Sequence, residues 1–461
     1  MDSSLDIASQ DARARAPWRK EVRATAALAG PLALTQLAQI AIATTDVILL
    51  GRYAPSALAA AGLGGSFYFT AWVFGAGLVS AVAPLAAQAV ALHDGARAGR
   101  IGAAGFRIAL LFGLPICALL AFVHPLLSAL GQPEVLAGPA QTYLRFAEWG
   151  YIPSLWFVAL RSLLAAFSKT RAALLVTLGG IAGNGLLGWI LIFGHAGVPA
   201  LGLIGSGLAG AITNLLMCLA LLLCVAADRQ AGHIGFFPAL RRPRRAPIGD
   251  ILRLGAPIGG TMLMEVGLFA VAIQIMGMIG SEALAAHQIA IQCAAIAFMV
   301  PIGIGQAATI RIAGASALRD RSGVRRAFRV ALGLGGLWAI VVASGFWTFG
   351  RFLVGLFLDL GNPANRSIAE LAVTFLVIAA LFQIVDTTQG VSAGALRGLK
   401  DTRIPMALAA LGYFGVGFPA CLTLAFPLGL GGIGVWIGLS VALGVVAMFL
   451  VARFLRLERR V

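Results

Sequence analysis

Charged residues are scarce in this chain, since Asp, Glu, Lys and Arg together make up only 11% of its 461 residues. A soluble domain of this length carries about 25% charged residues, so the composition excludes an ordinary soluble protein. Hydrophobic residues make up 60% of the chain, and glycine, which membrane helices tolerate better than soluble helices do, occurs 58 times. The sequence therefore indicates one integral membrane unit.

Cysteine is also rare, and motifs of known catalytic chemistry are missing. The five cysteines lie within apolar stretches, and none belongs to a CxxC motif or a Cys/His cluster, so we expect neither a disulfide framework nor a zinc site. The sequence lacks the GxSxG, HExxH and Walker A patterns. We therefore expect no enzymatic activity and no cofactor. Any transport would have to draw its energy from an ion gradient.

Apolar runs of about 20 or more residues recur along the whole chain, and each is long enough to cross a bilayer as a helix. We identify twelve, at approximately 25–50, 57–90, 101–123, 138–160, 172–194, 201–227, 250–278, 284–312, 327–350, 369–395, 405–427 and 432–454. The chain is thus predicted to be an all-α membrane protein with twelve transmembrane helices.

The basic residues indicate which side of the membrane the chain ends face. There are 34 Lys and Arg against 18 Asp and Glu, a net charge of +16, and most basic residues lie at the termini or after even-numbered runs. Basic loops accumulate on the cytoplasmic side, so we expect cytoplasmic N and C termini in a bacterial cytoplasmic (inner) membrane. This distribution explains the charge without a nucleic-acid partner. The expected partners are the lipid bilayer and small molecules, and we expect a monomer.

An internal repeat relates the two halves of the chain. A shift of 226 residues places Pro31 on Pro257, and Ala-Leu-Ala-Ala at 57–60 on the same sequence at 283–286. Each half then holds six spans, so both halves share one orientation and are related by an axis along the membrane normal. The sequence therefore predicts two six-helix bundles related by a pseudo-two-fold axis along that normal.

The repeat also predicts where the chain divides. The expected parts are a cytoplasmic N-terminal segment at 1–24, a first bundle at 25–227, a basic cytoplasmic linker at 228–249, a second bundle at 250–456 and a cytoplasmic tail at 457–461. Two homologous bundles suggest a cleft between them, and rocking of the bundles would expose a central site to each side in turn. Twelve spans alone would equally fit a channel or a membrane enzyme.

Three carboxylates, Asp46, Glu265 and Asp386, lie inside the apolar runs. A charge at that depth costs about 2.5–3.5 kcal/mol on insertion scales, so such an acid is a functional candidate by default. Desolvation penalises the ionised form of a carboxyl group, and an acid held there can carry a proton or bind a cation. The equivalent positions in the other half are Ala272, Gln39 and Ser154 respectively, the last under a shift of 232 residues. The acids therefore break the symmetry of the duplicated scaffold, which favours function.

Further polar residues accompany these acids. Gln383 and Gln389 lie three residues before and after Asp386, on the same helix face, and this polar face is expected to line a cavity. The candidates for contact with substrate are Gln383, Gln389, Gln39 and Met264. Met264 is included because Met surfaces adapt to varied apolar ligands. Asn184 is a lone amide in the fifth span that could supply an oxygen to a cation or hydrogen-bond a neighbouring helix.

Several segments, in order and at matching spacing, resemble the multidrug and toxic compound extrusion (MATE) family, in particular its NorM-like branch. The segments are Gly-Ala-Pro-Ile-Gly at 255–259 leading to Glu265, Ala-Ala-His-Gln at 285–288, Pro-Ile-Gly-Ile-Gly at 301–305, Asp386 with Gln389, Leu-Arg-Gly-Leu-Lys-Asp-Thr at 396–402, Leu-Arg-Ser at 160–162, Ser-Lys-Thr-Arg at 168–171 and the helix around Asp46. The resemblance covers nearly the whole length. It implies twelve helices in two bundles that export cationic amphipathic compounds by antiport against inward H⁺ or Na⁺.

The resemblance also implies roles for the acids. Glu265 and Asp386 look like the second-half acids used for cation or substrate coupling, where Na⁺ could bind. Asp46 looks like the first-half acid that protonates or joins an ion site with Asn184. Some family members place a carboxylate one turn after that asparagine, where this chain has Gly188, and the hydroxyl expected from the sixth helix falls near Gly210. Losing two oxygen ligands favours H⁺ over Na⁺ at Asp46.

Two other classes of function remain open. A lipid-linked precursor flippase, or a metabolite exporter, could use the same two-bundle scaffold. A flippase for anionic headgroups should carry basic residues in its cleft, whereas the span interiors here hold acids and almost no unpaired cations. A purely structural or receptor-like membrane protein is the second alternative, and substrate-dependent ion flux would exclude it.

Overall fold

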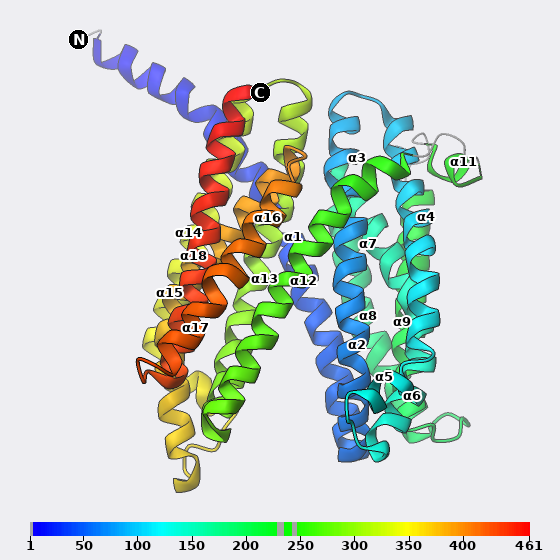
Figure 1. The fold of residues 1–461 in the computed structure, drawn as a ribbon. Coiled ribbons are helices and arrows are strands. Elements are labelled where there is room, and N and C mark those ends of the chain that lie inside the picture. Colours follow the sequence, from blue (N-terminus) through cyan, green and yellow to red (C-terminus); the bar gives the residue numbers. More distant parts are fainter. Residues whose placement is uncertain (1–2, 228–234, 242–246) are drawn as a thin grey trace. The chain divides into compact units, whose positions relative to one another are not determined.

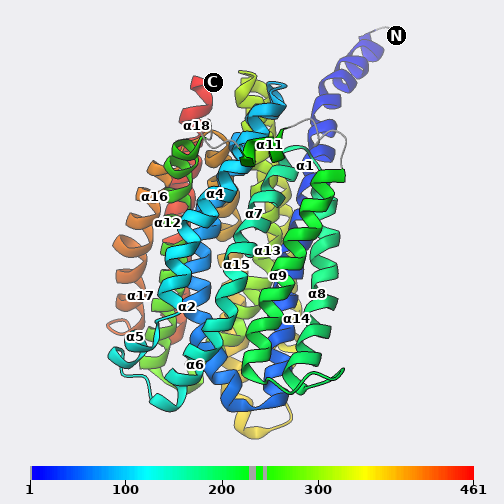
Figure 2. The same cartoon turned by 90° about the vertical axis from the view of Figure 1, so that its right-hand side faces the viewer.

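The computed structural model describes residues 3–227, 235–241 and 247–461, and within these ranges the chain is α-helical without a β-strand (Figures 1 and 2). A helix satisfies every backbone hydrogen bond within its own segment, which is required in lipid. Among the described residues, eleven helical segments are long and apolar enough to cross a membrane. The remaining expected span, at 138–160, is formed by α6 and α7, which are separated by the three-residue 3₁₀ turn η1.

The helices of the first half follow the predicted runs closely. They are α1 (Ser3–Tyr53), α2 (Pro55–Ser80), α3 (Val82–Ala91), α4 (Gly95–Leu120), α5 (His124–Ala129), α6 (Glu134–Ala147), η1 (Glu148–Gly150), α7 (Tyr151–Ala166), α8 (Thr170–Phe193) and α9 (Leu203–Ala227). The helices α2 and α3 together form one span, Pro55–Ala91. Most of the expected linker at 228–249 lies outside the described residues, and α11 (Phe236–Arg241) is the helix described within it.

The second half repeats this arrangement with longer helices. They are α12 (Ile248–Ile279), α13 (Ser281–Ala317), α14 (Arg321–Gly355), η3 (Pro363–Asn365), α15 (Arg366–Gly398), α16 (Arg403–Ala410), η4 (Leu411–Gly417), α17 (Phe418–Ala425), α18 (Gly431–Leu457) and η5 (Glu458–Arg460). The segment η4 is a π-helix inside the span Arg403–Ala425. Such π-helical turns are frequent at functional sites.

The chain forms two compact units, and both boundaries between them fall inside a helix. Unit 1 contains the chain up to Leu34 together with Met264–Val461, and unit 2 is Thr35–Leu263. The expected bundles at 25–227 and 250–456 have other boundaries, because α1 and α12 each contribute to both units. Within unit 1, the N-terminal end of α1 and the C-terminal end of α18 lie at the same end (Figures 1 and 2).

Close backbone packing at glycine accounts for these memberships. Within unit 1, a Cβ atom on Gly303 of α13 would lie 2.6 Å from the backbone nitrogen of Ala33. Within unit 2, a Cβ atom on Gly259 of α12 would lie 2.6 Å from the carbonyl oxygen of Phe74 on α2. Small residues allow membrane helices to approach this closely. The first part of α1 therefore packs in unit 1, and the first part of α12 packs in unit 2.

Candidate functional site

The intramembrane acid of unit 2 belongs to a chain of three polar side chains from three helices. Asn184 on α8 donates from Nδ2 to Oδ1 of Asp46 on α1 at 2.7 Å, and Thr213 on α9 donates from Oγ1 to Oδ1 of Asn184 at 3.1 Å. Asn184 is fully buried and Thr213 is nearly so. The threonine hydroxyl fixes the orientation of the asparagine amide, and the amide in turn holds the carboxylate.

Glycines on α8 let α1 approach closely enough for this contact. A Cβ atom on Gly188 would lie 2.7 Å from Cδ1 of Leu49, and one on Gly185 would lie 3.6 Å from Cγ2 of Thr45. The position where some relatives were expected to carry a second carboxylate is thus occupied by a leucine from α1. The structure leaves room for one acid here, Asp46.

The expectation that the sixth helix supplies no hydroxyl group to this site was wrong. Gly210 carries no such group, but Thr213, three residues later on α9, donates a hydrogen bond to Asn184. Residues three apart on a helix lie on one face, so the hydroxyl was available one turn from the position considered. Only one of the two oxygen ligands whose loss disfavoured Na⁺ at Asp46 is therefore missing. The signal in the sequence was a threonine, next to Asn214, in a largely apolar stretch.

The two acids of unit 1 belong to a second network. Glu265 on α12 and Asp386 on α15 interact electrostatically, and Glu265 also interacts with Arg397 at the end of α15. Gln389 donates from Nε2 to the hydroxyl oxygen of Tyr413 at 2.9 Å. Tyr413 lies in the π-helix η4 and interacts with both acids. The sequence suggested no role in the site for Arg397 or Tyr413, because the partners that give them one lie on other helices.

The predicted polar face of α15 is present, and it is buried within unit 1. Gln383, Asp386 and Gln389 are each at most 3% exposed. Gln383 donates from Nε2 to the carbonyl oxygen of Ala294 on α13 at 2.7 Å, so in this structure it links two helices. Oδ1 of Asp386 and Oε1 of Gln389 have no hydrogen-bond partner among the described residues. Unpaired buried oxygens next to an acid are suited to a proton or a cation.

The remaining substrate candidates, Gln39 and Met264, lie in different units. Met264 is half-buried at the start of the unit 1 part of α12. Gln39 accepts a hydrogen bond at 3.3 Å from Nη1 of Arg161 on α7, and Gln36 accepts one from the same nitrogen at 2.6 Å. Arg161 is only 8% exposed. It is a buried cation, although the sequence predicted almost no unpaired cations inside the spans.

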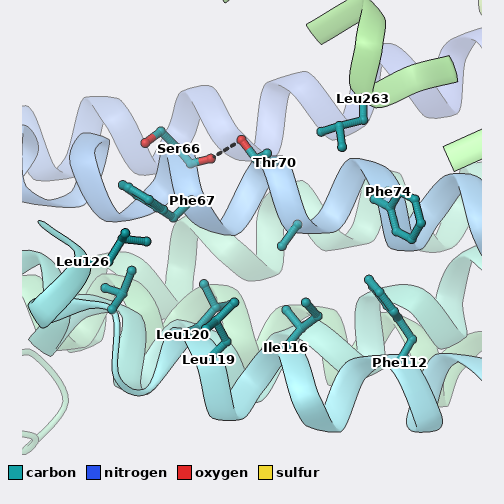
Figure 3. Close-up of a pocket in the computed structure, with 12 residues that line it drawn as sticks. Ser66, Phe67, Thr70, Phe74, Phe112, Ile116, Leu119, Leu120, Leu126 and Leu263 are labelled. Carbon is teal, nitrogen blue, oxygen red and sulfur yellow. Dashed lines mark hydrogen bonds between the residues drawn. The ribbon is translucent and has the colours of Figure 1, made fainter. Parts of the chain in front are cut away.

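An apolar cavity of about 520 Å³ lies in unit 2 (Figure 3). Its lining comes from α2, α4, α5 and their connection, with Leu263 of α12. Figure 3 shows Phe67 and Phe74 on one side and Phe112 on the other, with the hydroxyl of Thr70 bonded back to the carbonyl oxygen of Ser66 at 2.8 Å. The lining contains no ionisable side chain. Apart from the hydroxyl groups of Ser66 and Thr70, this cavity therefore offers apolar contact.

The membrane-length helices and the acids within them are those of an α-helical membrane protein of the transporter class. The MatE family model matches the chain twice, at residues 31–190 and 257–423. The two matches begin at Pro31 and Pro257, the residues that the internal repeat pairs. The chain belongs to this family, the multidrug and toxic compound extrusion (MATE) transporters, and to its NorM-like branch.

Bacterial relatives and solved structures agree with this family. The chain is 41% identical over 457 residues to the probable multidrug resistance protein NorM of Mesorhizobium japonicum, covering 97% of each chain. It is 43% identical over 438 residues to the protein of that name from Bradyrhizobium diazoefficiens, covering 95% of this chain and 93% of the relative. The relatives are transporters and not enzymes.

The fold is shared with proteins of much lower identity. The crystal structure of the eukaryotic MATE transporter AtDTX14 superposes with a TM-score of 0.84 at 18% identity, covering 96% of this chain and 98% of that one. The crystal structure of MATE in the bent conformation also gives a TM-score of 0.84 at 18% identity, covering 95% and 97%. The all-α membrane fold predicted from the sequence is thereby confirmed.

Proposed function

We propose that this multidrug transporter is a secondary active antiporter, which exports cationic amphipathic compounds in exchange for H⁺ or Na⁺ by alternating access. The observation that carries the proposal is the buried carboxylate of Asp386, whose Oδ1 is unpaired among the described residues and whose neighbour is Glu265. Two acids with one nearby arginine leave a negative charge that an incoming cation or proton can neutralise.

Competition for this charge supplies the coupling. Glu265 and Asp386 can hold either a coupling ion or the positive group of a substrate, and both ligands draw on the same carboxylates. Binding of the ion then favours release of the substrate, because a ligand shifts the equilibrium only through its different affinity for the two states. Na⁺ is a possible ligand at these two acids, since it prefers oxygen ligands.

The unit 2 network supports proton exchange at Asp46. Asn184 presents an N–H group to the carboxylate and its oxygen to the hydroxyl of Thr213. A metal cation at Asp46 would need the amide oxygen and would have to break both hydrogen bonds, whereas a proton needs neither change. We therefore assign H⁺ to Asp46 and leave both ions open for the acids of unit 1.

The apolar cavity and the chain ends fit the same function. Phenylalanine and leucine side chains of the unit 2 cavity offer a surface for the apolar part of an amphipathic substrate. We place the protein in the bacterial cytoplasmic (inner) membrane as a monomer, with both termini cytoplasmic and no nucleic-acid partner. The shared end of α1 and α18 in unit 1 and the bacterial relatives support this placement.

Transport in proteoliposomes tests the proposal. The purified protein is reconstituted, and movement of a fluorescent cationic dye is followed under an imposed pH gradient and then under an imposed Na⁺ gradient. We expect at least one gradient to accelerate dye movement, and the dye in turn to accelerate dissipation of that gradient. Dye movement that ignores both gradients would contradict antiport. Glu370→Gln is the control for variants that remove an acid. It removes an exposed carboxylate that pairs with Arg366 on the surface of α15.

A further inference from the structure

Arg161 of unit 2 is a buried cation whose known contacts are all neutral. Its Nη1 atom donates to Oε1 of Gln36 at 2.6 Å and to Oε1 of Gln39 at 3.3 Å. Its side chain is 8% exposed. Within the part of unit 2 that the structure describes, no carboxylate forms a hydrogen bond or ion pair with it. A buried charge is ordinarily paired, so this arginine requires an explanation.

The chemistry of the three side chains makes this cluster rich in donors. A guanidinium group has five N–H donors and no acceptor, so each glutamine must present its oxygen to it. The two contacts use Nη1 alone, which leaves the N–H groups of Nη2 and Nε unused among the described residues. The amide nitrogens of Gln36 and Gln39 then point away from Arg161 and are donors as well. What this cluster lacks is an anionic acceptor.

Unit 1 contains the equivalent arrangement with a different charge. The sequence Ala-Leu-Arg ends at Arg161 in one half of the chain and at Arg397 in the other. Gln39 is the repeat equivalent of Glu265, and Glu265 is the acid that interacts with Arg397. In both units, therefore, an arginine that follows Ala-Leu interacts with the residue at this repeat position. In unit 1 the acid Glu265 compensates the charge of Arg397, whereas in unit 2 the neutral Gln39 leaves the charge of Arg161 uncompensated.

We propose that Arg161, with Gln36 and Gln39, binds the carboxylate of zwitterionic amphipathic substrates. This inference rests on the proposed export function and specifies its substrate class, since a substrate with an amine and a carboxylate needs a cation in the protein as well as an acid. Guanidinium groups match the planar geometry of carboxylates and bind them with two parallel hydrogen bonds. The free N–H groups of Nη2 and Nε form one edge of such a fork.

Equilibrium binding of a matched pair of dyes tests the assignment without requiring transport. Rhodamine 6G is an ethyl ester with one positive charge, and its free acid has the same ring system with a carboxylate in place of the ester. Fluorescence anisotropy with the full-length protein in nanodiscs gives the affinity for each, and the acid-to-ester affinity ratio isolates the carboxylate. The proteins compared are the wild type, Arg161→Lys, Arg161→Gln, Gln39→Glu and the control Arg107→Gln. Arg107 also lies in unit 2 but donates to the carbonyl oxygens of Ala239 and Leu240.

We expect a lower acid-to-ester affinity ratio in the variants that lose the free positive charge. Arg161→Gln should lower the ratio about tenfold, the factor for one charge-assisted hydrogen bond. Gln39→Glu should lower it similarly, because it supplies the internal acid found in unit 1. Arg161→Lys should retain much of the ratio, and Arg107→Gln should leave it unchanged.

Other outcomes overturn the assignment. If Arg161 only joins α1 to α7, Arg161→Gln weakens both dyes equally and Gln39→Glu leaves the ratio at its wild-type value. No measurable binding of the acid by the wild type also overturns it. The assignment is also overturned if the protein transfers a fluorescent anionic lipid between leaflets but does not bind the acid. Failure of the antiport proposal is recognised separately, in the proteoliposome assay with the ester alone.

Discussion

Asp46 and Asn184 are joined by a 2.7 Å hydrogen bond across 138 residues of sequence, and the bond is oriented by the hydroxyl of Thr213. Replacing Thr213 by Val keeps the side-chain shape and removes that hydroxyl. One buried hydrogen bond contributes about 0.5–1.5 kcal/mol, so we expect ion-driven dye transport to fall about two- to tenfold. Initial rates in proteoliposomes measure the effect.

A matched control separates this effect from a general loss of hydroxyl groups. Thr177 on α8 is equally buried but donates to the carbonyl oxygen of Ala173 within its own helix. We expect Thr177→Val to transport at the wild-type rate and Thr213→Ser to retain most of the activity. A Thr213→Val protein that matches the wild type would show that the hydroxyl does not support Asp46.

The acids of unit 1 should be required for coupling. Glu265→Gln and Asp386→Asn preserve side-chain volume and remove the charge, so each should reduce gradient-driven dye efflux at least about tenfold. Asp46→Asn should do the same for the proton-driven component. Efflux from vesicles, compared at equal protein content, is the measurement. Full gradient-driven transport by all three variants would contradict the proposed coupling mechanism.

Close packing of α1 in unit 1 should make Gly303 intolerant of a side chain. Its Cβ atom would lie 2.6 Å from the backbone nitrogen of Ala33, which cannot move as a side chain can. Overpacking of this kind costs about 1–3 kcal/mol, so Gly303→Ala should lower the thermal unfolding midpoint. Gly333→Ala on α14 is the control, because its Cβ atom would meet no atom within 4 Å. Equal midpoints for both variants would refute the packing argument.

Stability should depend on pH through Asp320, which precedes α14. The backbone N–H of Gly323, at 2.8 Å, and the hydroxyl of Ser322 hold the pKa of Asp320 below its usual value. A group with a depressed pKa in the folded state stabilises the protein above its unfolded pKa, and this contribution is lost as pH falls through the folded pKa. The loss therefore belongs to pH values below the ordinary aspartate pKa of about 3.9.

Thermal unfolding of wild type and Asp320→Asn at several pH values checks this prediction. Asparagine is also a good N-terminal cap for a helix, so the variant should keep most of the cap and lose its share of the pH dependence. The difference between the two midpoints should shrink as the pH falls. A constant difference across the acidic range would mean that the charge of Asp320 does not stabilise α14.

The sequence predicted much of this fold, since apolar runs are local patterns and the internal repeat is visible when the two halves of the chain are compared. Asp46 and Asn184 stand out in the sequence as a lone acid and a lone amide in apolar spans, but only the family resemblance paired them, and the structure joins them by a hydrogen bond. Thr213, Arg397 and Tyr413 were not found. Each looks ordinary within its own helix, and only contact with residues on other helices gives it a role.

The boundaries of the two units could not be read from hydropathy. Leu34 and Met264 lie in the interior of continuous apolar helices, and membership there depends on which backbone a glycine such as Gly259 or Gly303 can approach. That is a property of the packed structure. The charge of Arg161 was similarly hidden, because sequence alone does not say whether a nearby acid compensates it.

The division inside α1 and α12 has a consequence for the origin of the molecule. The first half of the chain gives its opening segment to unit 1, and the second half gives the start of α12 to unit 2. If the halves were made as separate polypeptides, neither would complete its own unit, and each would have to lend a segment to the other. A single-repeat ancestor would thus have been a domain-swapped dimer. Gene fusion would then have made that exchange permanent within one chain.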